Sequence, residues 1–159
     1  MKPSSQLSVS TEFLELASRI LRDSQAQEGA MRTAISRSYY SVYLTVRDRL
    51  FGPDGRGLRR LERKLTRKFR RKRKRALGSH ELVLFAITDF SPTALMRPLT
   101  LYEQIDELKE ARVHADYHFT DENLKDIPYD AWSEYADRMV ALASQILPVA
   151  RQLLSFPLT

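Results

Sequence analysis

The chain has 159 residues, of which 43% are hydrophobic, and it contains no cysteine. This length suits one domain with its own core and is short for two, so residues 1–159 are predicted to form a single domain. The lack of cysteine excludes a disulfide framework, a cysteine-based zinc site and a thiol nucleophile. Residues 1–8 lack the apolar stretch of a signal peptide, and no run approaches the roughly 20 apolar residues of a membrane span. We therefore expect a soluble, cytoplasmic protein with no membrane partner.

The net charge of +6 hides a strong asymmetry along the chain. Residues 59–75 hold 12 of the 26 Lys and Arg residues and a single acid, Glu62, so this segment carries +11. The rest of the chain, with 14 basic and 19 acidic residues, carries −5. A polyanionic partner is therefore expected to bind this segment rather than the whole surface.

The apolar residues recur at three- and four-residue spacing, and no run alternates strictly enough for a strand, which predicts an all-α fold. A first helix is predicted over residues 11–25, with Ser10 or Thr11 as its cap. A second helix is predicted over residues 30–50, after Gly29, and the glycine-rich residues 51–57 should end it. Its three tyrosines, Tyr39, Tyr40 and Tyr43, cannot all face inward, so one or two are expected to line a cleft or an interface.

Residues 58–76 are predicted to form a basic insertion with a narrow apolar stripe, helical at least when bound to a partner. Its like charges repel, so residues 70–75 are expected to fray when free. A short helix should begin at Ser79 or His80, and another should span residues 101–117. Asp130 is predicted to cap a long last helix with Trp132 in the core, and Pro148 should kink that helix or loosen its last turns.

Two of the three histidines lie within residues 112–118, and catalytic residues are most expected in this segment. On a continuous helix Asp116 lies one turn after Arg112, which favours an ion pair, whereas His118 is about 120° around the helix and about 9 Å further along. Arg112 and His118 therefore meet only if the helix unwinds or if two copies pair across a two-fold axis. A simpler interpretation is a surface ion pair with solvated histidines at a helix end, and His80 is expected to be a capping or packing residue.

Arginine and histidine are enough for RNA cleavage, because the 2′-hydroxyl is an internal nucleophile. The reaction needs a base, an acid and a cation that stabilises the phosphorane charge. The sequence has no plausible metal cluster, and it has no glycine-rich phosphate loop or nucleophile elbow. No metal and no other cofactor is predicted.

Three phrases of the sequence resemble the HEPN superfamily. They are Ala-Ile-Ser-Arg-Ser-Tyr-Tyr-Ser-Val-Tyr at residues 34–43, Ser-His-Glu-Leu at residues 79–82, and Arg-x-x-Ala-Asp-Tyr at residues 112–117. The resemblance covers about residues 12–154. The chain is most similar to a branch of the superfamily that is often found beside nucleotidyltransferases. It implies an up-and-down helical bundle, here of four to six helices with the basic insertion, and often a homodimer.

In catalytic members of this family, an Arg followed by a His after four to six residues builds a metal-independent endoribonuclease site across the dimer. The resemblance implies that Arg112 clamps phosphate, His118 is the acid and base, and Asp116 orients Arg112. It also implies a toxin or defence role, with an antitoxin or nucleotidyltransferase as a further partner. Catalytic members usually place a polar residue after the Arg, whereas this chain has Val113, and the Ala-Asp-Tyr branch often lacks the His. A non-catalytic module that docks a nucleotidyltransferase or nucleic acid is therefore the alternative.

The basic segment is the part most expected to bind RNA, because a merely solvated helix face mixes charge signs and this one does not. A third hypothesis is an accessory protein in which this segment alone matters. The residues predicted to contact phosphates are Arg59, Arg60, Arg63, Lys64, Arg67, Lys68, Arg70, Arg71, Lys72, Arg73, Lys74 and Arg75.

Overall fold

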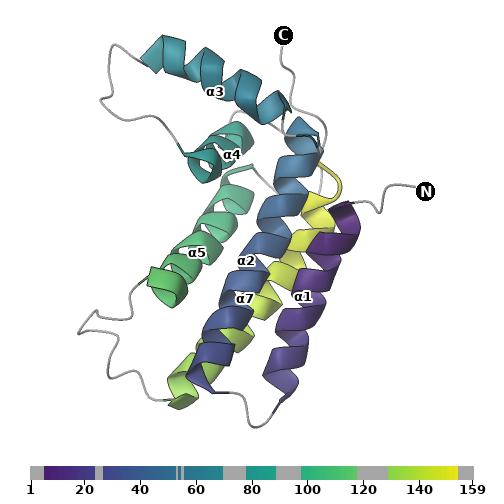
Figure 1. Cartoon of the computed structure of the whole chain (residues 1–159), viewed down its shortest axis with the longest axis vertical. Helices are drawn as coiled ribbons and strands as arrows, with labels where there is room; N and C mark the ends of the chain where they lie inside the picture. The colour runs from purple at the N-terminus through teal and green to yellow at the C-terminus, as the bar shows by residue number, and fades with distance from the viewer. Residues whose placement is uncertain are drawn as a thin grey trace.

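The computed structural model of the chain describes residues 6–23, 27–52, 54, 56–69, 78–88, 98–117 and 129–153. These residues form six α-helices and no strand, which confirms the predicted all-α class. The helices are α1 (Gln6–Arg22), α2 (Glu28–Phe51), α3 (Arg56–Phe69), α4 (Ser79–Thr88), α5 (Pro98–Tyr117) and α7 (Tyr129–Ala150). In Figure 1, α1, α2, α5 and α7 run alternately down and up, and α3 and α4 lie at the upper end. The up-and-down bundle is therefore confirmed.

Helix α2 is the centre of the fold and packs against each of the other five described helices. It is buried on nearly all sides, including at the polar positions Ser38, Ser41 and Thr45. Their hydroxyls donate to backbone carbonyls of the same helix, at 2.8 Å for Ser38 to Ala34 and 2.9 Å for Thr45 to Ser41. Small side chains that satisfy their own polar groups let the neighbouring helices approach α2 closely.

The larger of two core clusters is built mainly from side chains of α2, α4, α5 and α7, and the smaller one joins Ala17 of α1 to α2 and α7. Trp132 of α7 is only 1% exposed, which confirms its predicted place in the core. Leu101, Ile105 and Leu108 of α5 are buried at three- and four-residue spacing, so the inner face of α5 is fixed by its apolar stripe. The polar residues near its C-terminal end are therefore held at defined positions against α2.

Several helix ends differ from the sequence expectation. Helix α1 begins at Gln6, so Ser10 and Thr11 lie inside it rather than capping it, and Ser10 is fully buried. Helix α2 begins at Glu28 and so includes Gly29, which was expected to precede it. Helix α5 begins at Pro98, because proline is well suited to the first helical position. Asp130 likewise lies within α7 rather than before it.

Two glycines explain the sharp change of direction from α2 to α3. Gly52 ends α2 with a φ of 79°, a conformation that favours glycine, and its N–H donates to the carbonyl of Asp48 at 3.0 Å. A Cβ added at Gly57 would lie 2.6 Å from the carbonyl oxygen of Phe51, so only glycine permits α3 to start this close to the end of α2. Leu61 of α3 is buried, which anchors the basic helix to the bundle.

Candidate functional site

Arg112 lies in the second half of α5 and is held from two sides. Its Nε is 2.8 Å from Asp116 Oδ2, which confirms the predicted ion pair one turn along the helix. Its Nη2 donates to the hydroxyl of Tyr40 on α2 at 2.9 Å, and its guanidinium carbon lies 5.4 Å from the centroid of the Tyr40 ring. The Arg112 side chain is only 15% exposed, so its charge is fixed in a partly enclosed place.

Asp116 completes a polar contact between the two helices. Its Oδ2 accepts a hydrogen bond of 3.3 Å from the hydroxyl of Ser36. Ser36 and Tyr40 are four residues apart on α2, as Arg112 and Asp116 are on α5, so both pairs lie on facing surfaces. The orientation of the Arg112 guanidinium therefore depends on both helices, and the predicted contact of Asp116 with it is present.

A cluster of aromatic rings lies beside this contact. His80, in the first turn of α4, stacks on Tyr43 with ring centroids 4.3 Å apart and an angle of 17° between the rings. Its Nδ1 forms a short hydrogen bond with the hydroxyl of Tyr39. The ring of Tyr40 meets His80 edge-on, with centroids 6.2 Å apart. His80 and Arg112 thus lie against the same tyrosine, although they are far apart in the sequence.

Burial sets the protonation states in this cluster. Burial raises the pKa of Tyr39 above its ordinary value, and the neighbouring Tyr43 raises it further, so Tyr39 keeps its proton. Burial also lowers the pKa of His80 below its ordinary value, and the positive charges of Arg112 and Lys109 lower it further. At neutral pH the cluster is therefore an uncharged aromatic site next to a fixed cation.

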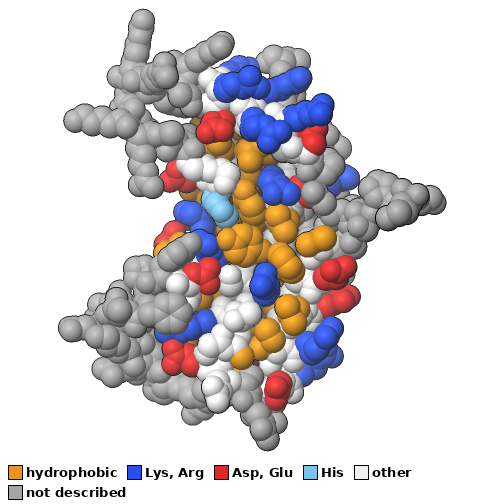
Figure 2. All heavy atoms as spheres, in the orientation of Figure 1, with side chains coloured by type: hydrophobic (Ala, Val, Ile, Leu, Met, Phe, Trp, Pro, Cys, Tyr) orange, Lys and Arg blue, Asp and Glu red, His pale blue; other side chains and the backbone are white. Residues whose placement is uncertain are grey.

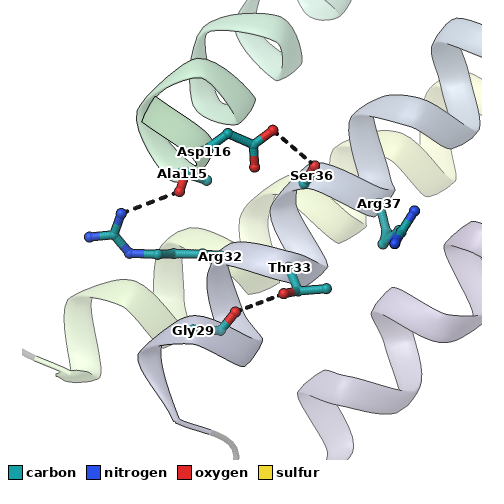
Figure 3. Close-up of a pocket in the computed structure, with 7 residues that line it drawn as sticks. All are labelled: Gly29, Arg32, Thr33, Ser36, Arg37, Ala115 and Asp116. Atoms are coloured by element: carbon teal, nitrogen blue, oxygen red, sulfur yellow. Dashed lines mark hydrogen bonds between the residues drawn. The ribbon is translucent and has the colours of Figure 1, made fainter. Parts of the chain in front are cut away.

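A pocket of about 360 Å³ opens on the other side of Asp116. In Figure 3 it lies between the start of α2 and the end of α5, and it is lined by Gly29, Arg32, Thr33, Ser36, Arg37, Ala115 and Asp116. Arg32 is 7% exposed, donates to the carbonyl of Ala115 at 3.2 Å and pairs with Glu28 at 2.6 Å. Arg32 therefore ties α2 to the end of α5.

The described part of the basic segment forms an exposed surface. Arg59, Arg60, Arg63 and Lys64 are all exposed on α3, and Figure 2 shows Lys and Arg side chains gathered at the upper end of the molecule, where α3 lies. The predicted helical insertion is confirmed as far as Phe69. The side chains of Arg67 and Lys68, and all of residues 70–75, lie outside the described part of the chain.

The ion pair predicted between Arg112 and Asp116 is present, but the sequence did not predict that His80 and Arg112 lie against the same tyrosine. His118 lies outside the described residues, and His114 is half-buried on α5. Tyr39 and Tyr43 are buried and Tyr40 is partly exposed, as the crowding of three tyrosines on one helix predicted. The packing role expected for His80 is present, but the sequence held no signal that α4 would bring it to Tyr40.

Comparison of the chain with protein-family models, with curated proteins and with solved structures gave no match. The resemblance to HEPN domains therefore stays a prediction. Among the described residues, no group of three or more His, Cys, Asp or Glu side chains is placed to hold a metal ion. None of the helices in the described part of the chain is long and apolar enough to cross a membrane.

Proposed function

We propose that the chain is a HEPN-type domain that binds RNA and cleaves it without a metal, with Arg112, Asp116 and His118 as its catalytic residues. The observation that carries this proposal is the placement of Arg112. Its guanidinium is held by an ion pair to Asp116 and by the hydroxyl of Tyr40, in a partly buried contact between α2 and α5. An oriented cation in a place with reduced water contact stabilises a phosphorane more strongly than a freely moving one.

The proposed reaction is an internal transesterification. The 2′-hydroxyl loses its proton to His118 and its oxygen bonds to phosphorus, the bond from phosphorus to the 5′-oxygen breaks, and protonated His118 returns the proton to that oxygen. The products are a 2′,3′-cyclic phosphate and a 5′-hydroxyl. Arg112 binds the non-bridging oxygens, and Asp116 keeps the guanidinium in place. The basic surface of α3 holds the RNA backbone. A toxin or defence role, with an antitoxin or nucleotidyltransferase as partner, belongs to the same proposal.

The site is proposed to be shared between two copies. On one continuous helix Arg112 and His118 are too far around and along the axis to reach one phosphate. A two-fold dimer with α5 near its axis brings the Arg112 of one copy towards the His118 of the other. A monomer at micromolar concentration in sedimentation would contradict the shared site.

The alternative is a non-catalytic module that docks a nucleotidyltransferase or nucleic acid, and one observation favours it. The contacts of Arg112 with Tyr40, and of Asp116 with Ser36, join α2 to α5, as a purely structural role would also require. Val113 also favours the docking module, because catalytic members of the resembled family usually have a polar residue directly after the Arg.

The two functions are separated by an assay of RNA cleavage in EDTA. We expect single-stranded RNA to be cut and to carry 2′,3′-cyclic phosphate ends. His118→Ala should lose roughly 10²–10⁴ in rate. His114→Ala, which removes a histidine from the same stretch of chain, is the matched control and should keep the rate. Equal rates for His118→Ala and the unchanged protein, or no cleavage at all, would favour the docking module.

A further inference from the structure

His80 presents one ring nitrogen to the surroundings, and the other is committed to Tyr39. Its Nδ1 is hydrogen-bonded to the Tyr39 hydroxyl. Nε2 makes no hydrogen bond to the described part of the chain, and His80 as a whole is partly exposed. Nε2 is therefore the nitrogen through which His80 can bind a ligand.

The bond to Tyr39 fixes which nitrogen carries the proton. Tyr39 is 1% exposed, and its hydroxyl has no other hydrogen bond within the described residues. If Tyr39 accepted a proton from Nδ1, its own buried O–H would lack an acceptor, which is costly. Tyr39 therefore donates to Nδ1, and a neutral His80 carries its proton on Nε2.

The two charged side chains that lower the pKa of His80 are both positive. From α2 it faces the three tyrosines of the aromatic cluster, and from α5 it feels the positive charges of Arg112 and Lys109. Lys109 is itself 3.6 Å from Asp106, which moderates its charge. An N–H donor on a ring that lies against the same tyrosine as an oriented guanidinium is complementary to an anion with acceptor oxygens.

We infer that His80 and Arg112 together bind one phosphate of the RNA backbone, with Nε2–H of His80 donating to a phosphate oxygen and Arg112 neutralising its charge. This inference rests on the proposed function, because it identifies the ligand with the RNA substrate. Tyr39 is the positioning residue that selects the tautomer. The neutral state of His80 matters, because with Nδ1 engaged by Tyr39 it serves as a fixed donor and leaves proton transfer to His118.

A bound phosphate changes the ionisation of His80 in a way that a packing role cannot. A negative charge close to Nε2 stabilises the imidazolium, so ligand binding raises the pKa of His80 from its lowered value. We propose to follow the three histidines by NMR with ¹⁵N-labelled histidine, using His80→Gln to assign the signal. The probes are inorganic sulfate, whose charge is constant near neutral pH, and a mixed-sequence single strand with 2′-O-methyl groups, which cannot be cleaved by this reaction.

The expected result has three parts. The free protein shows His80 protonated at Nε2, Tyr39→Phe mixes the tautomers, and both probes raise the pKa of His80. In Arg112→Gln the affinity for sulfate at His80 falls about 10-fold or more, because a charge-assisted partner is lost. An unchanged pKa of His80 with both probes, or an equal rise in Arg112→Gln, overturns the inference. A rise without RNA cleavage by the unchanged protein refutes only the proposed catalysis, and cleavage without a rise refutes only the inference.

Discussion

Positive charge is held in two contrasting ways in this molecule. Between α2 and α5, the side chain of Arg112 is 15% exposed, and its guanidinium is bonded to Tyr40 and Asp116. On α3, Arg59, Arg60, Arg63 and Lys64 are exposed on a helix that has one acid, Glu62. Among the side chains of α3 that the structure describes, Leu58 and Leu61 pack with the core and anchor this helix to the bundle.

The difference indicates two kinds of action on a polyanion. Charges on an exposed helix attract phosphates at long range, are screened by salt and have little preference for sequence. A half-buried guanidinium acts over hydrogen-bond distance, and its effect depends on direction as much as on charge. We therefore expect α3 to govern the affinity for RNA and Arg112 to govern the rate at which bound RNA is cleaved.

The largest expected effect is on cleavage in Arg112→Lys. Lysine keeps the charge but cannot bond Tyr40 and Asp116 with one planar group, so it tests direction rather than charge. We expect the single-turnover cleavage rate to fall about 10²–10³-fold, the usual cost of removing one oriented donor. RNA binding should change little. If the rate survives while the urea midpoint falls, Arg112 acts only as a tie between the helices.

The next effect is on the salt dependence of RNA binding when two charges on α3 are removed. Replacing Arg60 and Arg63 with Gln should flatten the slope of log K against log salt by about 1.4, from about 0.7 per phosphate on a single strand. The matched control is Arg19 and Arg22 of α1, which are also exposed and change the net charge equally. Equal slopes for the two double variants would show that net charge alone matters and that α3 is not the RNA surface.

The sequence predicted one of these regions much better than the other. The α3 surface depends on composition, and a run of like charges is visible without any structure. The Arg112–Asp116 pair follows from helical spacing alone. Tyr40 and His80 could not be placed beside Arg112, because their approach depends on how α2, α4 and α5 pack, and His80 comes from a short helix with no charge or motif that points to α5.

A smaller effect is expected on stability when the Tyr39 hydroxyl is removed. Tyr39→Phe keeps the stacking with Tyr43 and His80 but leaves Nδ1 of His80 without its donor, so the free energy of unfolding should fall by about 1 kcal/mol in urea denaturation. Tyr40→Phe, which removes the hydroxyl bonded to Arg112 at a more exposed position, is the comparison and should cost less. A larger loss for Tyr40→Phe would mean that the Arg112 contact, rather than the aromatic cluster, stabilises this region.

The smallest effect is the pH dependence of stability due to His80. Burial, with Arg112 and Lys109, lowers the pKa of His80 in the folded chain below the ordinary 6.5 that applies when the chain is unfolded. Between these two values the unfolded chain binds more protons, so stability decreases as the pH falls through 6.5 and levels off below the folded-state pKa. The aromatic cluster should show the opposite dependence at high pH, because the raised pKa of Tyr39 makes folding less favourable as the pH rises above 10.0, where the unfolded tyrosine ionises. For His80, the urea midpoint should fall more between pH 8 and pH 5 in the unchanged protein than in His80→Gln, because glutamine cannot titrate. The variant with Arg60 and Arg63 replaced is the control. It should follow the unchanged protein, because the charges that lower the pKa of His80 are those of Arg112 and Lys109. Equal pH dependence for His80→Gln and the unchanged protein would show that His80 titrates as it does in the unfolded chain, and that Arg112 and Lys109 do not act on it.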